Sequence, residues 1–165
     1  MKNVYKSIRD RLAEIAELRY IELNFGQLEG DDDQYPVHFP AALIDFERIE
    51  WGTTTQRIQN GLATVRLTVL FENYNMSSNL QPSDISDAAL TEFTLLNQIQ
   101  SKLQGYGSVY HNALIRRSTV RISIKSPRVY EITYQCNITD CYGQKQYDEG
   151  QANQLNADVQ YSITQ

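Results

Sequence analysis

The chain has 165 residues, of which 41% are hydrophobic and 21% charged, and these proportions are typical of one soluble globular domain. Its net charge of −5 disfavours general affinity for nucleic acid, because phosphate binding depends on lysine and arginine. No segment approaches the ~18 apolar residues of a membrane span, and the charged N-terminus lacks the apolar core of a signal peptide, so we expect neither a membrane partner nor secretion.

The first predicted element is a helix over residues 2–22. Apolar residues recur there every three or four positions, and the stripe is narrow enough to cover a sheet. They are Val4, Ile8, Leu12, Ile15, Leu18 and Ile21. Gly26 is expected to close this region, and the run of acidic residues at 29–33 predicts an exposed loop.

Two strands are predicted next, Ala41–Trp51 and about 56–74, joined by a hairpin tip at Gly52–Thr55. Apolar and polar residues alternate with one exception over Leu62–Glu72, as expected for a sheet with one packed face and one wet face. The apolar phase of the first strand switches midway, which predicts a bulge near Glu47–Arg48.

A second helix is predicted after a loop at 75–82. Ser83 or Asp84 can cap its start, because a short side-chain oxygen accepts a bond from a first-turn amide. Gly105 stands where a left-handed residue ends a helix. The expected buried line consists of Ala89, Phe93, Leu96, Ile99 and Leu103.

Two further alternating strands are predicted, at about Leu114–Lys125 and Val129–Asp140. Residues 142–165 are rich in glutamine and asparagine and predict a polar C-terminal arm beyond a single domain at 1–141. The order of elements predicts an α+β fold, with a mostly antiparallel sheet of about four strands packed by two helices.

The sequence contains no recognisable catalytic, cofactor-binding or metal-binding motif, so we expect no such residues. Neither His38 nor His111 has partners at metal-ligand spacing or a positioned nucleophile. Asp31–Asp33 lacks the spaced oxygens of a calcium loop and is better explained as a solvated loop. Cys136 has the apolar parity of its strand, which favours a buried thiol over a disulfide with Cys141.

Five basic residues occur within thirteen positions, and no acidic residue lies between Leu114 and Tyr130. They are Arg116, Arg117, Arg121, Lys125 and Arg128. Arg121 and Lys125 have polar parity, so we expect them on one exposed face. Three explanations stay open: a strand edge that discourages aggregation, a nucleic-acid patch without interleaved aromatic residues, or a protein contact.

For the protein contact, the acidic residues Asp31, Asp32 and Asp33 of another copy are the expected counterpart. Patches of opposite charge at different places on one molecule suit a head-to-tail interface. Such an interface generates a ring when the rotation closes.

The order and texture of these elements resemble the tail-terminator and tail-completion proteins of long-tailed bacteriophages, which are head–tail joining proteins. The resemblance covers about residues 1–140. It is carried by the helix Val4–Ile21, the lead-in Tyr35-Pro-Val-His-Phe-Pro40, the strands at 41–46 and 61–71, the helix at 88–103 and the hairpin ending at 129–136.

The resemblance implies a homo-oligomer in the virion, usually a hexameric ring, assembled in the cytoplasm of a bacterial host. Such a ring caps the tail tube, joins it to the head connector and conducts DNA without sequence-specific binding; no enzyme activity or cofactor is implied. Two alternatives stay open. One is a neck or baseplate adaptor that binds through residues 142–165, and the other is a ligand-binding or enzymatic domain with a cavity near Tyr106, Tyr110 and Tyr130.

Overall fold

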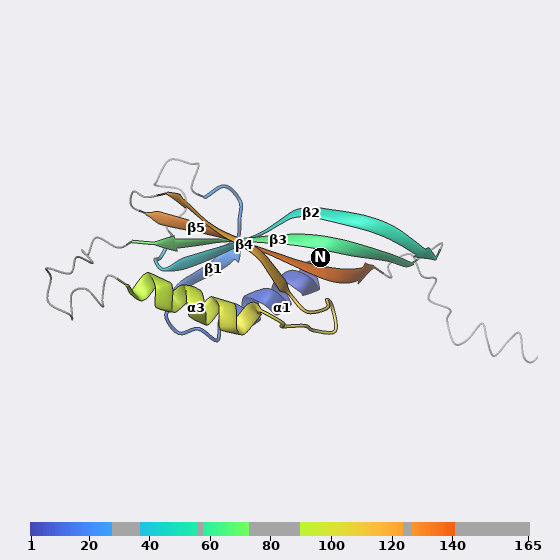
Figure 1. Cartoon of the computed structure of the whole chain (residues 1–165), viewed down its shortest axis with the longest axis horizontal. Coiled ribbons are helices and arrows are strands. Elements are labelled where there is room, and N and C mark those ends of the chain that lie inside the picture. Colours follow the sequence, from blue (N-terminus) through green and yellow to red (C-terminus); the bar gives the residue numbers. More distant parts are fainter. Residues whose placement is uncertain (28–36, 56–57, 73–89, 124–126, 141–165) are drawn as a thin grey trace, which may run out of the picture.

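The computed structural model describes residues 1–27, 37–55, 58–72, 90–123 and 127–140 (Figure 1). These residues form one mixed sheet of five strands and two helices, so the predicted α+β class and the mostly antiparallel sheet are confirmed. The strand count is five where about four were expected. The loop at 75–82, Ser83, Asp84 and the arm at 142–165 lie outside the described residues.

The elements follow the chain in the order α1 (Lys2–Leu12), β1 (Tyr20–Leu23), β2 (Ala41–Thr55), β3 (Ile58–Phe71), α3 (Thr91–Leu103), β4 (Ile115–Ser123) and β5 (Arg128–Asp140). In the sheet they are arranged β1-β2-β3-β5-β4. β1 runs parallel to β2, and the other neighbours are antiparallel. Both helices lie on one face of the sheet (Figure 1), which we call the helix face; the opposite face is the outer face.

The main core lies between the helix face and the two helices. Ile44, Leu67 and Ile132 stand opposite one another across three strands and are at most 1% exposed. Helix side chains that are equally buried meet them, namely Ile8, Leu12, Ile99 and Leu103. Side chains alternate across a strand, so the same parity that points these residues inward sends their neighbours to the outer face.

The predicted first helix is wrong in its second half. α1 ends at Leu12, and the amides of Ile15 and Leu18 donate to the carbonyls of Leu12 and Ile15 at 3.0 and 3.1 Å. These turns span three residues, and a spacing of exactly three between apolar residues suits them better than the 3.6 of an α-helix. Ile21 belongs to β1, which pairs with the first four residues of β2.

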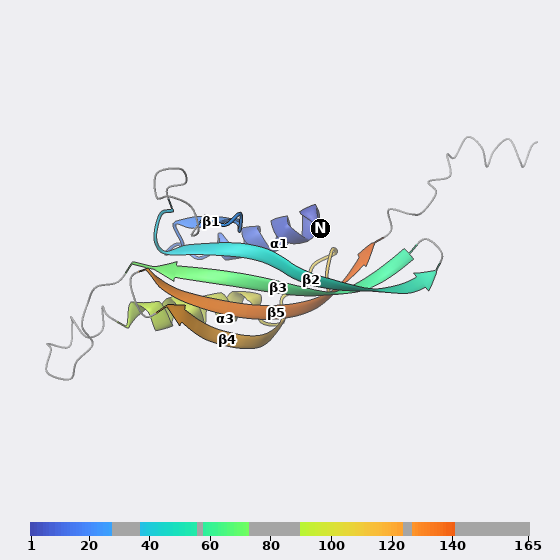
Figure 2. The same cartoon turned by 90° about the horizontal axis from the view of Figure 1, so that it is seen from above.

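The predicted bulge in β2 is confirmed, because the register with β3 shifts between Phe46 and Arg48. The predicted hairpin tip at Gly52–Thr55 is wrong: these residues continue β2, and Thr55 stands opposite Ile58. The hairpin is therefore longer than expected, and Figure 2 shows β2 and β3 running on together past the helices.

In α3 the buried line differs from the expected one. Phe93 is 48% exposed, whereas Glu92 and Leu95 are buried beside Ile99 and Leu103. Gly105 has the positive φ of 77° that was expected for a residue ending the helix. Gly26 also has a positive φ, of 82°, but it follows β1 and not a helix.

Candidate assembly surface

β4 is exposed on both of its faces. All side chains from Ile115 to Ile122 are exposed, and three of them are apolar: Ile115 (40%), Val120 (49%) and Ile122 (56%). The neighbouring strand β5 alternates between buried and less buried positions in the ordinary way. Because β4 is the last strand on its side of the sheet, its side chains contribute little to the core.

The register with β5 assigns the side chains of β4 to faces. Arg116 and Arg121 stand opposite Tyr134 and Tyr130 and therefore belong to the helix face, whereas Val120 stands opposite Glu131 on the outer face. The alternation of this strand predicts a packed side for Val120 and Ile122, but both are exposed. Two register shifts, each with one extra residue on β4, help to turn the strand away from the packed layer.

The backbone edge of β4 is open over most of its length. At its start, the Arg116 amide donates to the Gln104 side chain at 3.0 Å, and the Leu114 amide donates to the Tyr106 carbonyl at 2.8 Å. From Ser118 to Ile122, no described residue offers a backbone partner on the side away from β5. An open edge is a template for pairing with another strand.

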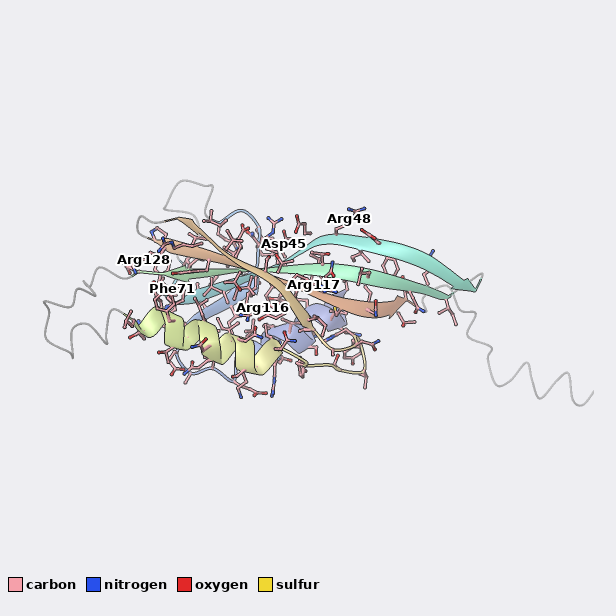
Figure 3. All side chains as sticks on the ribbon, viewed as in Figure 1. Asp45, Arg48, Phe71, Arg116, Arg117 and Arg128 are labelled. Carbon is pink, nitrogen blue, oxygen red and sulfur yellow. The ribbon has the colours of Figure 1, made fainter. Side chains whose placement is uncertain are left out.

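The four described basic residues of the predicted cluster have different settings, and Figure 3 shows three of them, Arg116, Arg117 and Arg128. Arg116 and Arg121 belong to the helix face, and Arg117 donates to the Gln135 side chain at 2.7 Å on the outer face. Arg128 is the first residue of β5, two positions before Tyr130, and forms an ion pair with Glu92. Lys125 and Asp31–Asp33 lie outside the described residues, so their pairing stays a prediction.

Glu92 is a buried carboxylate that the sequence analysis missed. Its Oε1 accepts from Arg128 at 3.0 Å and from the Tyr130 hydroxyl at 3.3 Å, while Oε2 has no hydrogen-bond partner among the described residues. Burial, together with the charge of Glu92, raises the pKa of Tyr130. The signal was present, since Glu92 precedes Leu95 and Ile99 at helical spacing on the buried side of α3.

The opposite side of the sheet has a second open edge. β1 pairs only as far as Ile44, so the segment Asp45–Thr55 of β2 has no described strand on that side. Asp45, Glu47 and Glu50 lie on the outer face of this segment, and Arg48 is its one basic residue. Figure 3 shows Asp45 and Arg48 on the side of the sheet away from the helices.

A pocket was predicted near Tyr106, Tyr110 and Tyr130. An open pocket of about 580 Å³ does lie beside Tyr106 and Tyr110, against Lys6, Ser7 and Asp10 of α1. Tyr130 does not line it and contacts Glu92 instead.

Beside this pocket, Ser7 joins α1 to the turn after α3. Its Oγ lies 3.0 Å from the Tyr106 hydroxyl and 3.3 Å from Nε2 of the buried His111. His111 Nδ1 lies 2.8 Å from the Asn112 carbonyl, which can only accept, so Nδ1 carries the hydrogen. The network explains why His111 is buried: it fastens the turn to the helix.

No protein-family model matches the sequence, and no match was found among curated proteins. Within the described ranges, no group of three or more histidine, cysteine or carboxylate side chains is placed to hold a metal ion. Neither described helix is long and apolar enough to cross a bilayer.

Proposed function

We propose that this protein is a structural subunit of a phage virion that assembles into a ring at the head–tail junction. The ring would cap the tail tube and join it to the head connector. The observation that supports this proposal is β4, an edge strand with an open backbone, two exposed faces and three exposed apolar side chains.

The energetic argument starts from these side chains. Full burial of a valine or isoleucine is worth roughly 1.5–3 kcal/mol, and Ile115, Val120 and Ile122 gain only part of this in the isolated chain. Pairing with another strand would bury them and would also provide partners for the open amides and carbonyls. The strand is therefore better explained as a contact surface than as part of a core.

The charges on β4 argue against a symmetric dimer through this strand. Pairing β4 with β4 of another copy would bring Arg116, Arg117 and Arg121 near the same three arginines, and like charges facing each other destabilise a strand pair. A head-to-tail contact avoids this repulsion. Repeated by a rotation that closes, it gives a ring.

The net charge of −5 is compatible with a channel through which DNA slides without sequence-specific binding, because 20 acidic residues outnumber 15 basic ones and repel phosphates. In this proposal the protein works through docking and carries out no reaction. It would assemble in the cytoplasm of the bacterial host and act in the virion.

Mass photometry of the purified full chain, alone and with purified tail tubes, tests this proposal. We expect ring-sized particles, or rings that form at the ends of the tubes, visible by negative-stain imaging. A chain that stays monomeric at all concentrations and leaves the tubes bare would contradict it.

Two alternatives have their own tests. A neck or baseplate adaptor that binds through residues 142–165 would lose assembly completely when these residues are deleted, whereas a ring built on β4 would only be weakened. A ligand-binding domain is favoured by the pocket at Tyr106 and Tyr110, where Lys6, Ser7 and Asp10 present polar groups. A small polar ligand that shifts the NMR signals of these residues in the monomer would support that alternative.

A further inference from the structure

We infer that β4 of one copy pairs with the segment Asp45–Thr55 of β2 of a second copy, so that neighbouring sheets become continuous. This inference depends on the proposed ring and names the surface that receives β4. It is carried by three features of the described residues: two open edges, opposite charges on the outer face, and an exposed tryptophan on the helix face.

The two open edges lie on opposite sides of one sheet. The strand order places β4 at one end, and β2 is open beyond Ile44 at the other, because β1 covers only its first four residues (Figure 2). Each copy can therefore receive one neighbour and bind another. This is the geometry that a head-to-tail assembly requires.

The outer faces of the two edges carry opposite charge. Asp45, Glu47 and Glu50 with Arg48 give the β2 segment a net charge of −2, although Glu50 pairs with Arg48 at 3.1 Å and Glu47 pairs with Arg66 of β3. β4 holds three arginines and no acidic residue. On the outer face, Arg117 would meet this acidic segment. Pairing two β2 edges would oppose acid to acid, so only the mixed pair is favourable.

On the helix face, Trp51 offers a partner for the remaining arginines. Trp51 is 44% exposed, and it belongs to the helix face because it stands opposite Gly61, which in turn stands opposite the buried Ile138. Arg116 belongs to the same face of its own sheet, as does Arg121, whose guanidinium also interacts with the Tyr130 hydroxyl. When two sheets become continuous, the helix faces of both copies lie on the same side. A guanidinium of one copy can then lie over the indole of the other and form a cation–π contact.

Charge reversal tests the inference in the full chain. One variant carries Arg117→Glu with Arg121→Glu, and the other carries Asp45→Lys with Glu50→Lys. We expect each variant alone to lose the oligomer, with self-association at least about tenfold weaker, and a one-to-one mixture of the two to recover it. Lys6→Glu, an exposed reversal on α1, is the matched control and should leave assembly unchanged; circular dichroism reports whether each variant folds.

Cross-linking provides a second measurement that does not depend on charge. In a Cys141→Ser background, Val120→Cys is combined in turn with Arg48→Cys, Glu50→Cys and Gly52→Cys, which share the outer face of β2. A short bis-maleimide reagent should link copies into a ladder for at least one of these pairs. Val120→Cys with Lys6→Cys should not give a ladder.

The outcomes separate the inference from the proposed function. If both reversal variants form oligomers of the wild-type size and no cysteine pair gives a ladder, the inference is overturned. The proposed ring is not contradicted by that result. Recovery of the Arg117 and Arg121 variant by Asp32→Lys with Asp33→Lys, and not by the β2 variant, would assign the contact to the acidic loop and also overturn it. A wild-type chain that never assembles, even on tail tubes, would overturn both.

Discussion

The guanidinium of Arg128 donates a hydrogen bond of 3.0 Å to the buried carboxylate of Glu92 and so ties the first turn of α3 to the start of β5. Arg128 belongs to the same run of basic residues as Arg117, yet the two side chains have different settings. Arg117 donates to Gln135 on an exposed strand and forms no ion pair with a described residue. One arginine stabilises the fold, and the other is available to a partner.

Replacing Arg128 with alanine should therefore destabilise the monomer. Removing one member of a buried pair costs about 3–5 kcal/mol, and the partial exposure of Arg128 reduces this to roughly 2–3 kcal/mol. Arg117→Ala, the matched control, should change the free energy of unfolding by less than about 1 kcal/mol. Urea unfolding measures the free energy of unfolding of both variants. Equal losses in the two variants would contradict the different roles assigned to Arg128 and Arg117.

Gly61 is required by its neighbours on β2. A Cβ at this position would lie 2.8 Å from both Ile49 Cγ2 and Trp51 Cε3, so Gly61→Ala should displace the indole and cost about 1–3 kcal/mol. Trp51 is the one tryptophan in the chain, so its fluorescence reports the displacement directly.

Gly52→Ala is the matched control for Gly61→Ala. The nearest atom to its Cβ would be the Asn60 carbonyl oxygen at 3.7 Å, which is an ordinary contact. We expect unchanged fluorescence and a change in stability within about 0.5 kcal/mol. An emission shift in this variant as large as that of Gly61→Ala would argue against close packing as the cause.

The local spacing of apolar residues predicted much of this fold. Alternation placed β3 and β5 within a few residues, and a phase switch in β2 located the bulge after Phe46. The end of α1 was missed because residues 12, 15 and 18 keep a buried stripe in three-residue turns as they would in a helix. Periodicity indicates which side chains are buried. An α-helix and a series of three-residue turns can bury the same side chains, so periodicity does not distinguish them.

The thiol of Cys136 should be protected in the folded chain. Burial raises its pKa to about 11, so the thiol stays neutral where an exposed cysteine begins to ionise. In a Cys141→Ser background, iodoacetamide at pH 8.5 should react at Cys136 only after denaturant is added. Rapid alkylation of the native chain would contradict this.

Because the pKa of Cys136 is higher in the folded state than in the unfolded state, its contribution to stability is complete below the unfolded value. It is lost as the pH rises toward about 11. Cys136→Ala should reduce this alkaline part of the stability profile. The parent with Cys136 intact serves as the reference.

Acid should weaken the contact between the two helices. Hydrogen bonds from Lys102, at 2.7 Å, and from Arg11 lower the pKa of Glu14 below its ordinary 4.5. A lowered pKa stabilises the fold at neutral pH, and this stabilisation disappears as the pH falls through the folded value. Glu14→Gln should flatten the acid limb of the unfolding free energy, as should Lys102→Met. An unchanged limb in both variants would exclude this contact as a source of the pH dependence.

The candidate assembly surface was only half predictable from the sequence. Composition identified a basic segment, but the division of Arg116, Arg117 and Arg128 among three settings depends on the bulges of β4 and on the pairing of α3 with β5. The acidic edge at Asp45–Glu50 was missed because β1 was predicted as helix. The end of β1 decides which part of β2 has an open edge. The spacing of apolar residues did not reveal β1.

Amide hydrogen exchange along β4 shows whether this strand forms the contact between copies. The amides from Ser118 to Ile122 should exchange rapidly in a dilute monomer and slowly once copies assemble, because those that face the open edge would then donate to a neighbouring strand. Protection of this segment, together with 45–55, is the predicted result. Assembled rings in which β4 exchanges as fast as in the monomer would contradict the account.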